Sequence, residues 1–258
     1  MLRFFKKKKI VVEDKKVIPQ EDYSDIEIIA NYFQKETGVT FDSQMRILEN
    51  KVNLFCKQRK IYSYTQLLVD IQSDKALKQE LIDRLTTNET YFYREFKQIQ
   101  ELVELVKKSH GKVTILCAPS ATGEEPYSIA IALLEAGISY STFKIMGIDI
   151  NADAITKAKE AVFWERNIRN LSPQIISKYF KQKDKDFALN QNIKSLVSFQ
   201  IANIFDDSFT NLGKFDFIFS RNMLIYFDKE TKLKAKTILE NMRKESKHPV
   251  FFGHADLF

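Results

Sequence analysis

The sequence predicts an α/β domain with a parallel sheet, preceded by an all-helical N-terminal domain and interrupted by a small inserted antiparallel β subdomain. Residues 24–108 carry apolar side chains at helical spacing and contain no convincing strand. From residue 113 onward, short apolar runs alternate with amphipathic stretches, as in a parallel sheet that helices cover on both faces. Residues 162–201 break this alternation, which is why an insertion is expected there.

The helical N-terminal domain is expected to span residues 21–108. Its second amphipathic segment carries Arg46, Lys57 and Lys60 on one side and apolar residues on the other, so one face is predicted to be core and the other basic. The first segment ends on Gly38, a typical helix stop. The helical segments read DIEIIANYFQKETG, SQMRILENKVNLFCKQRK, YTQLLVDI and KALKQELIDRL.

The α/β domain is expected to span residues 109–258. Open parallel sheets bind ligands at the carboxyl ends of their strands, near the point where the strand order reverses, and residues 118–126 are expected to lie there. The predicted strands are 113–118, 144–150, 215–220 and 250–254, and the predicted helices are 124–136, 152–161 and 229–245.

The inserted β subdomain is expected at about residues 165–200. Ser172 and Pro173 suit the N-cap and the first position of a short helix. The run FALNQNIKSLVSFQIA, residues 187–202, suggests two short strands around a polar turn. We therefore predict a β hairpin over that run.

Bulk properties narrow the class of protein. The 258 residues, 44% of them hydrophobic, suffice for one sizeable core and a smaller companion domain. Cys56 and Cys117 match no metal or redox spacing, which predicts free thiols in a reducing compartment. No apolar run approaches the roughly 18 residues of a membrane span, and four lysines interrupt the first apolar residues before a signal peptide could form. A cytoplasmic protein without membrane insertion is expected.

The positive charge is concentrated at the N-terminus. Residues 1–16 contain seven basic and two acidic residues, so they supply +5 of the net charge of +6. Residues 1–20 are therefore predicted to be a basic, solvated and disordered tail, with weak attraction to acidic surfaces as the alternative. Because the remaining chain is nearly neutral, a nucleic-acid partner is not expected.

The turn between the first strand of the sheet and its helix is acidic. Glu124 and Glu125 would repel phosphate at a helix start, so a cationic ligand fits better, with simple dipole capping as the alternative. Pro126 suits the first helical turn, and Gly123 is expected to let the backbone approach a ligand. Asp149 closes the second strand, where nucleotide-binding α/β folds place an acid on the ribose hydroxyls. S-adenosylmethionine has a ribose and a cationic arm but no phosphate.

Four separated sequence blocks resemble the chemotaxis receptor glutamate methyltransferases of the CheR family. They are RLTTNETYFYRE (84–95), APSATGEEPYSIAIAL (118–133), GIDIN (147–151) and FDFIFSRNMLIYFD (215–228). The resemblance covers about residues 24 to 254. It implies a Rossmann-like S-adenosylmethionine-dependent methyltransferase domain that methylates glutamate side chains in the cytoplasmic helical domain of chemoreceptors. The products would be glutamate methyl esters and S-adenosylhomocysteine.

The resemblance also implies site residues. Arg94 and Tyr226 would be catalytic: a guanidinium can bind the methionine carboxylate in a bidentate manner, and a phenol near the methyl group adds no charge. Structural roles are the alternatives for three positions: a helix cap for Thr90, a half-buried aromatic for Tyr226 and a salt bridge for Arg221. The implied cofactor contacts are Asn88, Thr90, Arg94, Glu125, Asp149, Asn203, Ile204, Arg221 and Asn222.

The implied chemistry needs neither a general base nor a metal. A glutamate with an ordinary pKa of about 4.3 is already ionised at neutral pH, so no catalytic histidine or cysteine is expected. His254 matches a family position, with a structural role as the alternative. Arg46, Lys57 and Lys60 are expected to meet the glutamate-rich receptor helices, unless they are only a solvated surface. We expect a monomer.

Other functions remain open at this point. A non-catalytic protein that senses S-adenosylmethionine and binds a partner would share the cofactor contacts. A methyltransferase acting on another protein or on nucleic acid would share the core. Enzymes that methylate base amino groups favour an Asn/Asp-Pro-Pro-aromatic run after the fourth strand, whereas this chain has RNMLIYF at residues 221–227.

Overall fold

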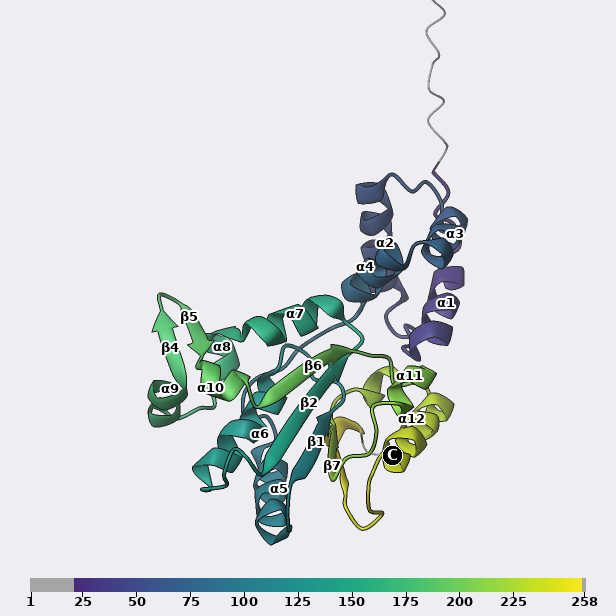
Figure 1. Ribbon diagram of the computed structural model, residues 1–258. Helices are drawn as coiled ribbons and strands as arrows, with labels where there is room; N and C mark the ends of the chain where they lie inside the picture. The colour runs from purple at the N-terminus through teal and green to yellow at the C-terminus, as the bar shows by residue number, and fades with distance from the viewer. Residues whose placement is uncertain (1–20, 257–258) are drawn as a thin grey trace, which may run out of the picture.

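A computed structural model describes residues 21–256, so the basic tail predicted at residues 1–20 lies outside the described residues. The first four helices gather at one end of the molecule, above the sheet (Figure 1). They enclose a core of their own, which includes Phe33, Leu48, Phe55 and Leu67. Gly38 ends the first helix with φ 78°, as predicted from its position. The four helices are α1 (Glu27–Thr37), α2 (Met45–Arg59), α3 (Tyr64–Ser73) and α4 (Lys75–Leu85).

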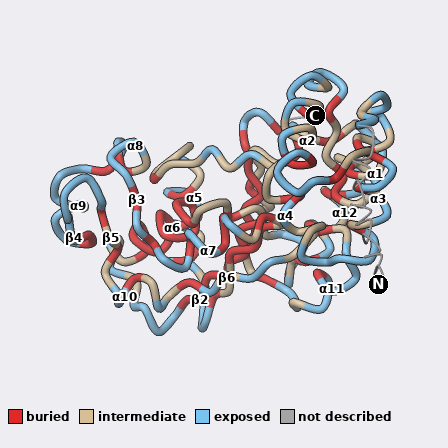
Figure 2. Tube along the Cα trace, turned by 90° about the horizontal axis from the view of Figure 1, so that it is seen from above, coloured by how far each residue is buried: buried red, intermediate tan, exposed pale blue. Residues whose placement is uncertain are grey.

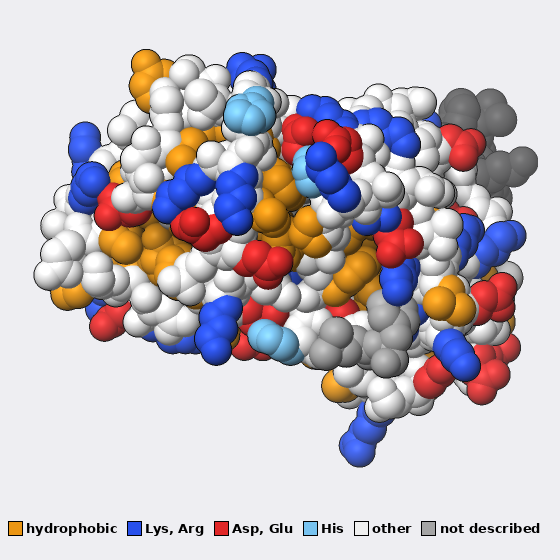
Figure 3. All heavy atoms as spheres, turned by 90° about the horizontal axis from the view of Figure 1, so that it is seen from below, with side chains coloured by type: hydrophobic (Ala, Val, Ile, Leu, Met, Phe, Trp, Pro, Cys, Tyr) orange, Lys and Arg blue, Asp and Glu red, His pale blue; other side chains and the backbone are white. Residues whose placement is uncertain are grey.

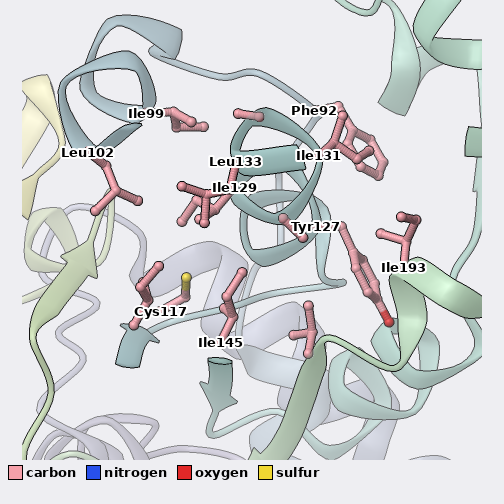
Figure 4. Packing of buried hydrophobic residues seen from close by; sticks show 14 of the residues in the cluster. Phe92, Ile99, Leu102, Cys117, Tyr127, Ile129, Ile131, Leu133, Ile145 and Ile193 are labelled. Atoms are coloured by element: carbon pink, nitrogen blue, oxygen red, sulfur yellow. The ribbon is translucent and has the colours of Figure 1, made fainter. Parts of the chain in front are cut away.

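The fifth helix, α5 (Phe96–Lys108), packs with the sheet and not with α1–α4. Its apolar face, including Ile99, Leu102 and Val106, belongs to the core beneath the sheet (Figure 4). By packing, this helix is part of the α/β domain, although the sequence places it in the helical N-terminal segment.

A parallel sheet of five strands forms the centre of the molecule, as the alternation of strands and helices predicts. Its order is β6-β2-β1-β7-β8, and all four pairings are parallel. The chain runs outward from β1 to β2 and β6, then returns to β7 on the other side of β1, so the strand order reverses between β1 and β7. The strands are β1 (Val113–Cys117), β2 (Phe143–Asp149), β6 (Val197–Ile201), β7 (Phe217–Ser220) and β8 (Val250–Phe252).

Helices cover both faces of the sheet. Since side chains point alternately to the two faces along each strand, each strand contributes to two cores. Ile115 and Cys117 face one core, with α5 and α6, while Leu116 faces the other, with α12. Figure 4 shows Tyr127, Ile129 and Leu133 of α6 among side chains of the sheet and α5, and Figure 2 shows buried residues in the interior of the molecule, around β2 and α6. The helices outside the insertion that follow α5 are α6 (Glu124–Glu135), α7 (Ala152–Glu160), α11 (Asp207–Thr210), α12 (Lys229–Asn241) and the 3-10 helices η1 (Leu224–Tyr226) and η2 (His254–Asp256).

The insertion is a three-stranded antiparallel sheet with the order β3-β5-β4. Ser172 caps its longest helix and Pro173 occupies the first helical position, as predicted. The elements are β3 (Val162–Trp164), α8 (Glu165–Ile168), α9 (Pro173–Tyr179), β4 (Phe180–Lys183), β5 (Asp186–Leu189) and α10 (Gln191–Lys194).

The hairpin predicted over residues 187–202 is wrong. β5 pairs back with β4, and β6 instead joins the main sheet in parallel to β2, with Val197 opposite Ile145. As an edge strand, β6 is only partly covered, so its apolar residues alternate with exposed Ser198 and Gln200. That alternation is also typical of a hairpin strand, and it cannot distinguish the two.

Two properties of the described chain bear on its partners. Across residues 21–256, no helix combines the length and the apolar character that crossing a membrane requires. The face seen from below, away from α1–α4, carries Lys and Arg interspersed with Asp and Glu (Figure 3).

Candidate active site

A cavity of about 450 Å³ opens at the carboxyl ends of β1, β2, β6 and β7. This is the edge of the sheet at which the sequence predicts a ligand, and the volume lies within the usual range for small-molecule sites. All ten residues proposed for cofactor binding or catalysis line it: Asn88, Thr90, Arg94, Glu125, Asp149, Asn203, Ile204, Arg221, Asn222 and Tyr226.

One wall of the cavity comes from the helical N-terminal segment, and sequence reasoning missed it. Thr37 at the end of α1, Gln44, Ile47 and Lys51 of the α2 region, and Leu85 at the end of α4 all face the cavity. An amphipathic pattern identifies the buried face of a helix. It carries no signal for which of the other residues border a cleft.

Asp149 is the most enclosed acid of the cavity, at 4% exposure. Its two carboxylate oxygens accept the backbone N–H groups of Ala121 and Asn151, both at 2.9 Å. Burial raises the pKa of Asp149 to about 6, against the lowering effect of these N–H groups. At neutral pH the carboxylate is therefore ionised and fixed in direction, as an acceptor for sugar hydroxyls requires.

The two acids at the start of α6 have different roles. Glu124 is fully buried and faces the protein: one oxygen accepts from Thr122 Oγ1 at 2.6 Å and the other from Asn167 Nδ2 at 2.7 Å. Burial raises the pKa of Glu124 to about 7. Glu125 lines the cavity instead. Only the second acid of the turn is therefore available to a cationic ligand.

Glu125 forms a buried ion pair with Arg221 and still has unused bonding capacity. Its Oε2 accepts from Arg221 Nε, and the two side chains are 10% and 2% exposed. Its Oε1 is buried and has no hydrogen-bond partner within the described chain. Burial raises the pKa of Glu125, while the neighbouring guanidinium opposes that rise. A buried carboxylate oxygen without a partner at a cavity wall is a site for a donor, and an ammonium group would satisfy it.

Gly123 does not serve the ligand in the way that the sequence suggested. It lies outside the cavity lining. It has φ 96°, and a Cβ at this position would lie 3.1 Å from Ala158 and Tyr127 and 3.2 Å from Phe199. Close packing and a left-handed backbone require glycine here. Pro126 occupies the first turn of α6, as predicted.

Arg221 also holds the segment that carries Arg94. Its Nη1 donates to the carbonyl oxygens of Arg94 at 2.8 Å and Glu95 at 3.4 Å. The Arg94 guanidinium in turn donates to the carbonyl of Glu89 at 3.0 Å. Burial raises the pKa of Tyr226, and the charge of Arg94 acts in the opposite direction, so the two proposed catalytic side chains lie within electrostatic reach of each other.

Asp256 supports the loop after β7, a role that the sequence did not reveal. It is fully buried, and its carboxylate accepts the backbone N–H groups of Asn222, of Ile225 at 3.2 Å and of Gly253 at 3.1 Å. Asn222 has φ 59°, so this support holds a backbone conformation that is unfavourable for most residues. His254 lies outside the cavity lining, with its side chain 74% exposed and Nδ1 3.1 Å from Glu95 Oε2.

The basic face predicted for α2 is exposed, and the opposite face is core. Arg46, Lys57 and Lys60 are exposed, and they do not line the cavity. Ile47 and Lys51 of the same helix do line it. The amino end of the helix therefore lies at the cavity rim, with Arg46 next to Ile47, whereas Lys57 and the C-cap residue Lys60 lie at its other end. The buried residues of α2 are Leu48, Val52, Phe55 and Cys56.

Comparison with known proteins agrees with this geometry. Residues 88–258 match the family model described as "CheR methyltransferase, SAM binding domain". The chain belongs to the CheR methyltransferase family. The matched segment begins at Asn88 and includes Arg94, the acidic turn, Asp149 and the loop after β7, whereas α1–α4 precede it.

Several CheR relatives extend over nearly the whole chain. A chemotaxis protein methyltransferase of Campylobacter jejuni is 35% identical, covering 95% of this chain and 92% of the relative. "Chemotaxis protein methyltransferase 2" of Vibrio cholerae is 32% identical over 88% of this chain and 83% of the relative. The chemotaxis protein methyltransferase of Borreliella burgdorferi is 29% identical over 90% and 86%. Methyltransferase activity is thus the function of the family.

Proposed function

We propose that this CheR protein transfers a methyl group from S-adenosylmethionine to glutamate carboxylates of chemoreceptors, forming methyl esters. The observation that carries the proposal is the cavity in which Asp149 and Glu125 present two fixed acids, an arrangement that would repel phosphate. Family membership and the names of the relatives support the same reaction.

The residues present fit S-adenosylmethionine. Asp149 would accept the ribose hydroxyls, and the unpartnered Oε1 of Glu125 would accept the amino group of the methionine part. Arg94 would bind the methionine carboxylate. Asn203 and Ile204, in the loop that follows β6, would border the adenine. Bound S-adenosylmethionine supplies a methyl group that its sulfonium activates.

The chain would act by alignment and by exclusion of water. A substrate glutamate with an ordinary pKa of about 4.3 is ionised at neutral pH, so none of the cavity side chains has to remove a proton. Charge is neutralised as the methyl group moves, which favours a dry site. Arg94 and Tyr226 would orient the reacting groups, and Ile47 and Ile225 at the rim would limit access of water.

The reaction is tested by transfer of a labelled methyl group to receptor-containing membranes, followed by mild alkali. A methyl ester releases labelled methanol, whereas a methylated amine or base retains the label. Release of methanol from receptor is the expected result. Binding of S-adenosylmethionine without any transfer would instead indicate a sensing protein. Label that is stable to alkali would indicate a different methyl acceptor.

Cofactor affinity is expected to fall in acid. Because the pKa of Asp149 is about 6 and the ribose needs its ionised form, the affinity should be constant above pH 7 and fall up to about tenfold per pH unit below 6. Calorimetric titration with S-adenosylhomocysteine from pH 5 to 8 measures this profile. Asp149→Asn is the control and should bind weakly at every pH. A flat wild-type profile would refute the assignment of Asp149 to the ribose.

The exposed basic residues of α2 are expected to steer the acidic receptor helices. Replacement of Arg46, Lys57 and Lys60 by alanine should raise the KM for receptor and flatten its salt dependence, because screening acts over about 8 Å at physiological ionic strength. Cofactor affinity should not change. The assay is receptor methylation at low and high salt.

A matched control removes three exposed lysines near the amino ends of β1 and β2, away from the cavity: Lys108, Lys112 and Lys144. This control variant carries the same change in charge and should keep the wild-type KM. If both triple variants behave alike, α2 is only a solvated surface and the receptor is recognised elsewhere.

A further inference from the structure

The loop that follows β2 and carries Asp149 is held by helix α4. Asp83 Oδ1 accepts the backbone N–H of Ala152 at 2.7 Å, and Gln79 Nε2 donates to the carbonyl of Ile150 at 2.8 Å. Gln79 Nε2 also lies 2.9 Å from Asp83 Oδ1, so the two side chains form one unit. Three consecutive residues after Asp149 are thereby fixed from a helix that lies about 70 residues earlier in the sequence.

Asn151 connects this contact to the carboxylate itself. Its side-chain amide donates to the carbonyl of Asp83 at 3.1 Å and to Thr86 Oγ1 at 2.7 Å. Its backbone N–H donates to Asp149 Oδ1 at 2.9 Å. Asn151 is 2% exposed, so water cannot easily replace these partners. A shift of α4 would therefore move the N–H group that orients Asp149.

Other parts of the N-terminal helices, α1 and the connection from α1 to α2, contact two more loops of the cavity. Asn203 Nδ2 donates to the carbonyl of Glu36, the penultimate residue of α1, at 2.7 Å. The backbone N–H of Thr40, in the connection between α1 and α2, donates to the carbonyl of Tyr226 at 2.8 Å. The contact at Asp83 differs from these two because a carboxylate side chain makes it, so a substitution can test it.

We infer that Asp83 is a positioning residue for cofactor binding: with Gln79 it fixes residues 150–152, so that Asp149 is held in the direction that the ribose requires. The inference rests on the proposed function, because it assumes that Asp149 binds the ribose of S-adenosylmethionine. It makes the helical N-terminal segment part of the cofactor site as well as a surface for receptor.

Electrostatics give this contact a measurable signature. Burial is the main cause of the raised pKa of Asp149; the N–H groups of Asn151, Ala121 and Ile150 lower that pKa, and the nearby charge of Asp83 raises it. As a like charge, Asp83 contributes to the raised pKa of Asp149. The carboxylate of Asp83 contacts the backbone N–H of Ala152, the first residue of α7. The dipole of α7 favours a negative charge at that end of the helix.

The test compares three variants by calorimetric titration with S-adenosylhomocysteine, alongside thermal unfolding. Asp83→Ala removes the acceptor of the Ala152 N–H and should raise the Kd about tenfold. Asp83→Asn keeps an acceptor oxygen and should bind nearly as tightly as wild type at pH 8. Its acid limb should shift to lower pH, because the like charge beside Asp149 is gone. Glu80→Ala, on the same helix but paired with Arg59, is the matched control and should change neither property.

A merely structural contact would lower the unfolding temperature of Asp83→Ala without changing its Kd at temperatures where the variant is folded. The inference is overturned if folded Asp83→Ala binds with the wild-type Kd, or if Asp83→Asn, which keeps an acceptor oxygen, binds no more tightly than Asp83→Ala at pH 8. If Asp83→Ala does not fold, Gln79→Ala takes its place: it removes the donor to the Ile150 carbonyl and should also raise the Kd, and a wild-type Kd for that variant overturns the inference. A wild-type protein that binds no S-adenosylhomocysteine overturns the proposed function together with this inference, whereas equal binding by wild type and Asp83→Ala overturns only the inference.

Discussion

Replacing Arg221 with methionine is expected to lower the free energy of unfolding by about 3–5 kcal/mol at pH 8. The guanidinium is the ion-pair partner of Glu125, and both side chains lie almost entirely out of solvent. Removal of one partner leaves a buried carboxylate without its counter-charge. The same substitution deletes the bonds to the carbonyls of Arg94 and Glu95, so cofactor affinity should fall as well. Urea unfolding and calorimetry measure the two effects.

The loss of stability should depend on pH with a definite sign. Glu125 already has a raised pKa in the folded protein, and loss of Arg221 raises that pKa further. The penalty relative to wild type therefore grows as pH rises above the folded pKa of Glu125 in the wild-type protein, because only the variant continues to lose stability there, and it should be smaller at pH 5 than at pH 8. The double variant with Glu125→Gln removes the isolated charge and should recover much of the stability. A single variant within about 1 kcal/mol of wild type at pH 8 would contradict a buried ion pair.

Local signals in the sequence predicted most elements of the fold, since their causes are local. Gly38 ends α1, Ser172 and Pro173 begin α9, and continuous apolar runs mark the central strands. β6 was assigned to a hairpin because a half-covered edge strand and a hairpin strand share the same alternation. Pairing partners depend on contacts distant in the sequence, and alternation does not encode them.

Sequence predicts a site residue well when the fold fixes its position and only one role is usual for that residue type there. Asp149 at the end of β2 is such a residue, and the structure places it at the cavity. Glu124 and Glu125 look alike in sequence, and only packing shows that the first binds Thr122 and Asn167 while the second faces the cavity. Residues that act through another group, such as Asp256, bear no motif of their own. Their partners become visible only when the chain is folded.

Arg94→Ala is expected to lower kcat about 100-fold at saturating S-adenosylmethionine, beyond any effect on cofactor affinity. The guanidinium lines the cavity, and its charge reaches both Tyr226 and Glu125. It therefore lies near both Glu125, the proposed partner of the cofactor's amino group, and Tyr226 at the proposed transfer site. If Arg94 also aligns the reacting groups, its loss slows the reaction of the complex that has already bound cofactor. Saturation with S-adenosylmethionine should then not restore kcat. Single-turnover methylation of receptor, with cofactor Kd measured separately, distinguishes binding from alignment.

Two further variants sharpen the interpretation of Arg94. Arg94→Lys keeps the charge but loses the planar fork of donors, so its kcat should fall between those of wild type and Arg94→Ala. Lys97→Ala removes an exposed positive charge three residues later, outside the cavity, and should leave kcat unchanged. If Arg94→Ala reaches the wild-type kcat once cofactor is saturating, Arg94 contributes binding alone. Alignment would then have to come from Tyr226 and the backbone of the loop after β7, which Asp256 holds in place.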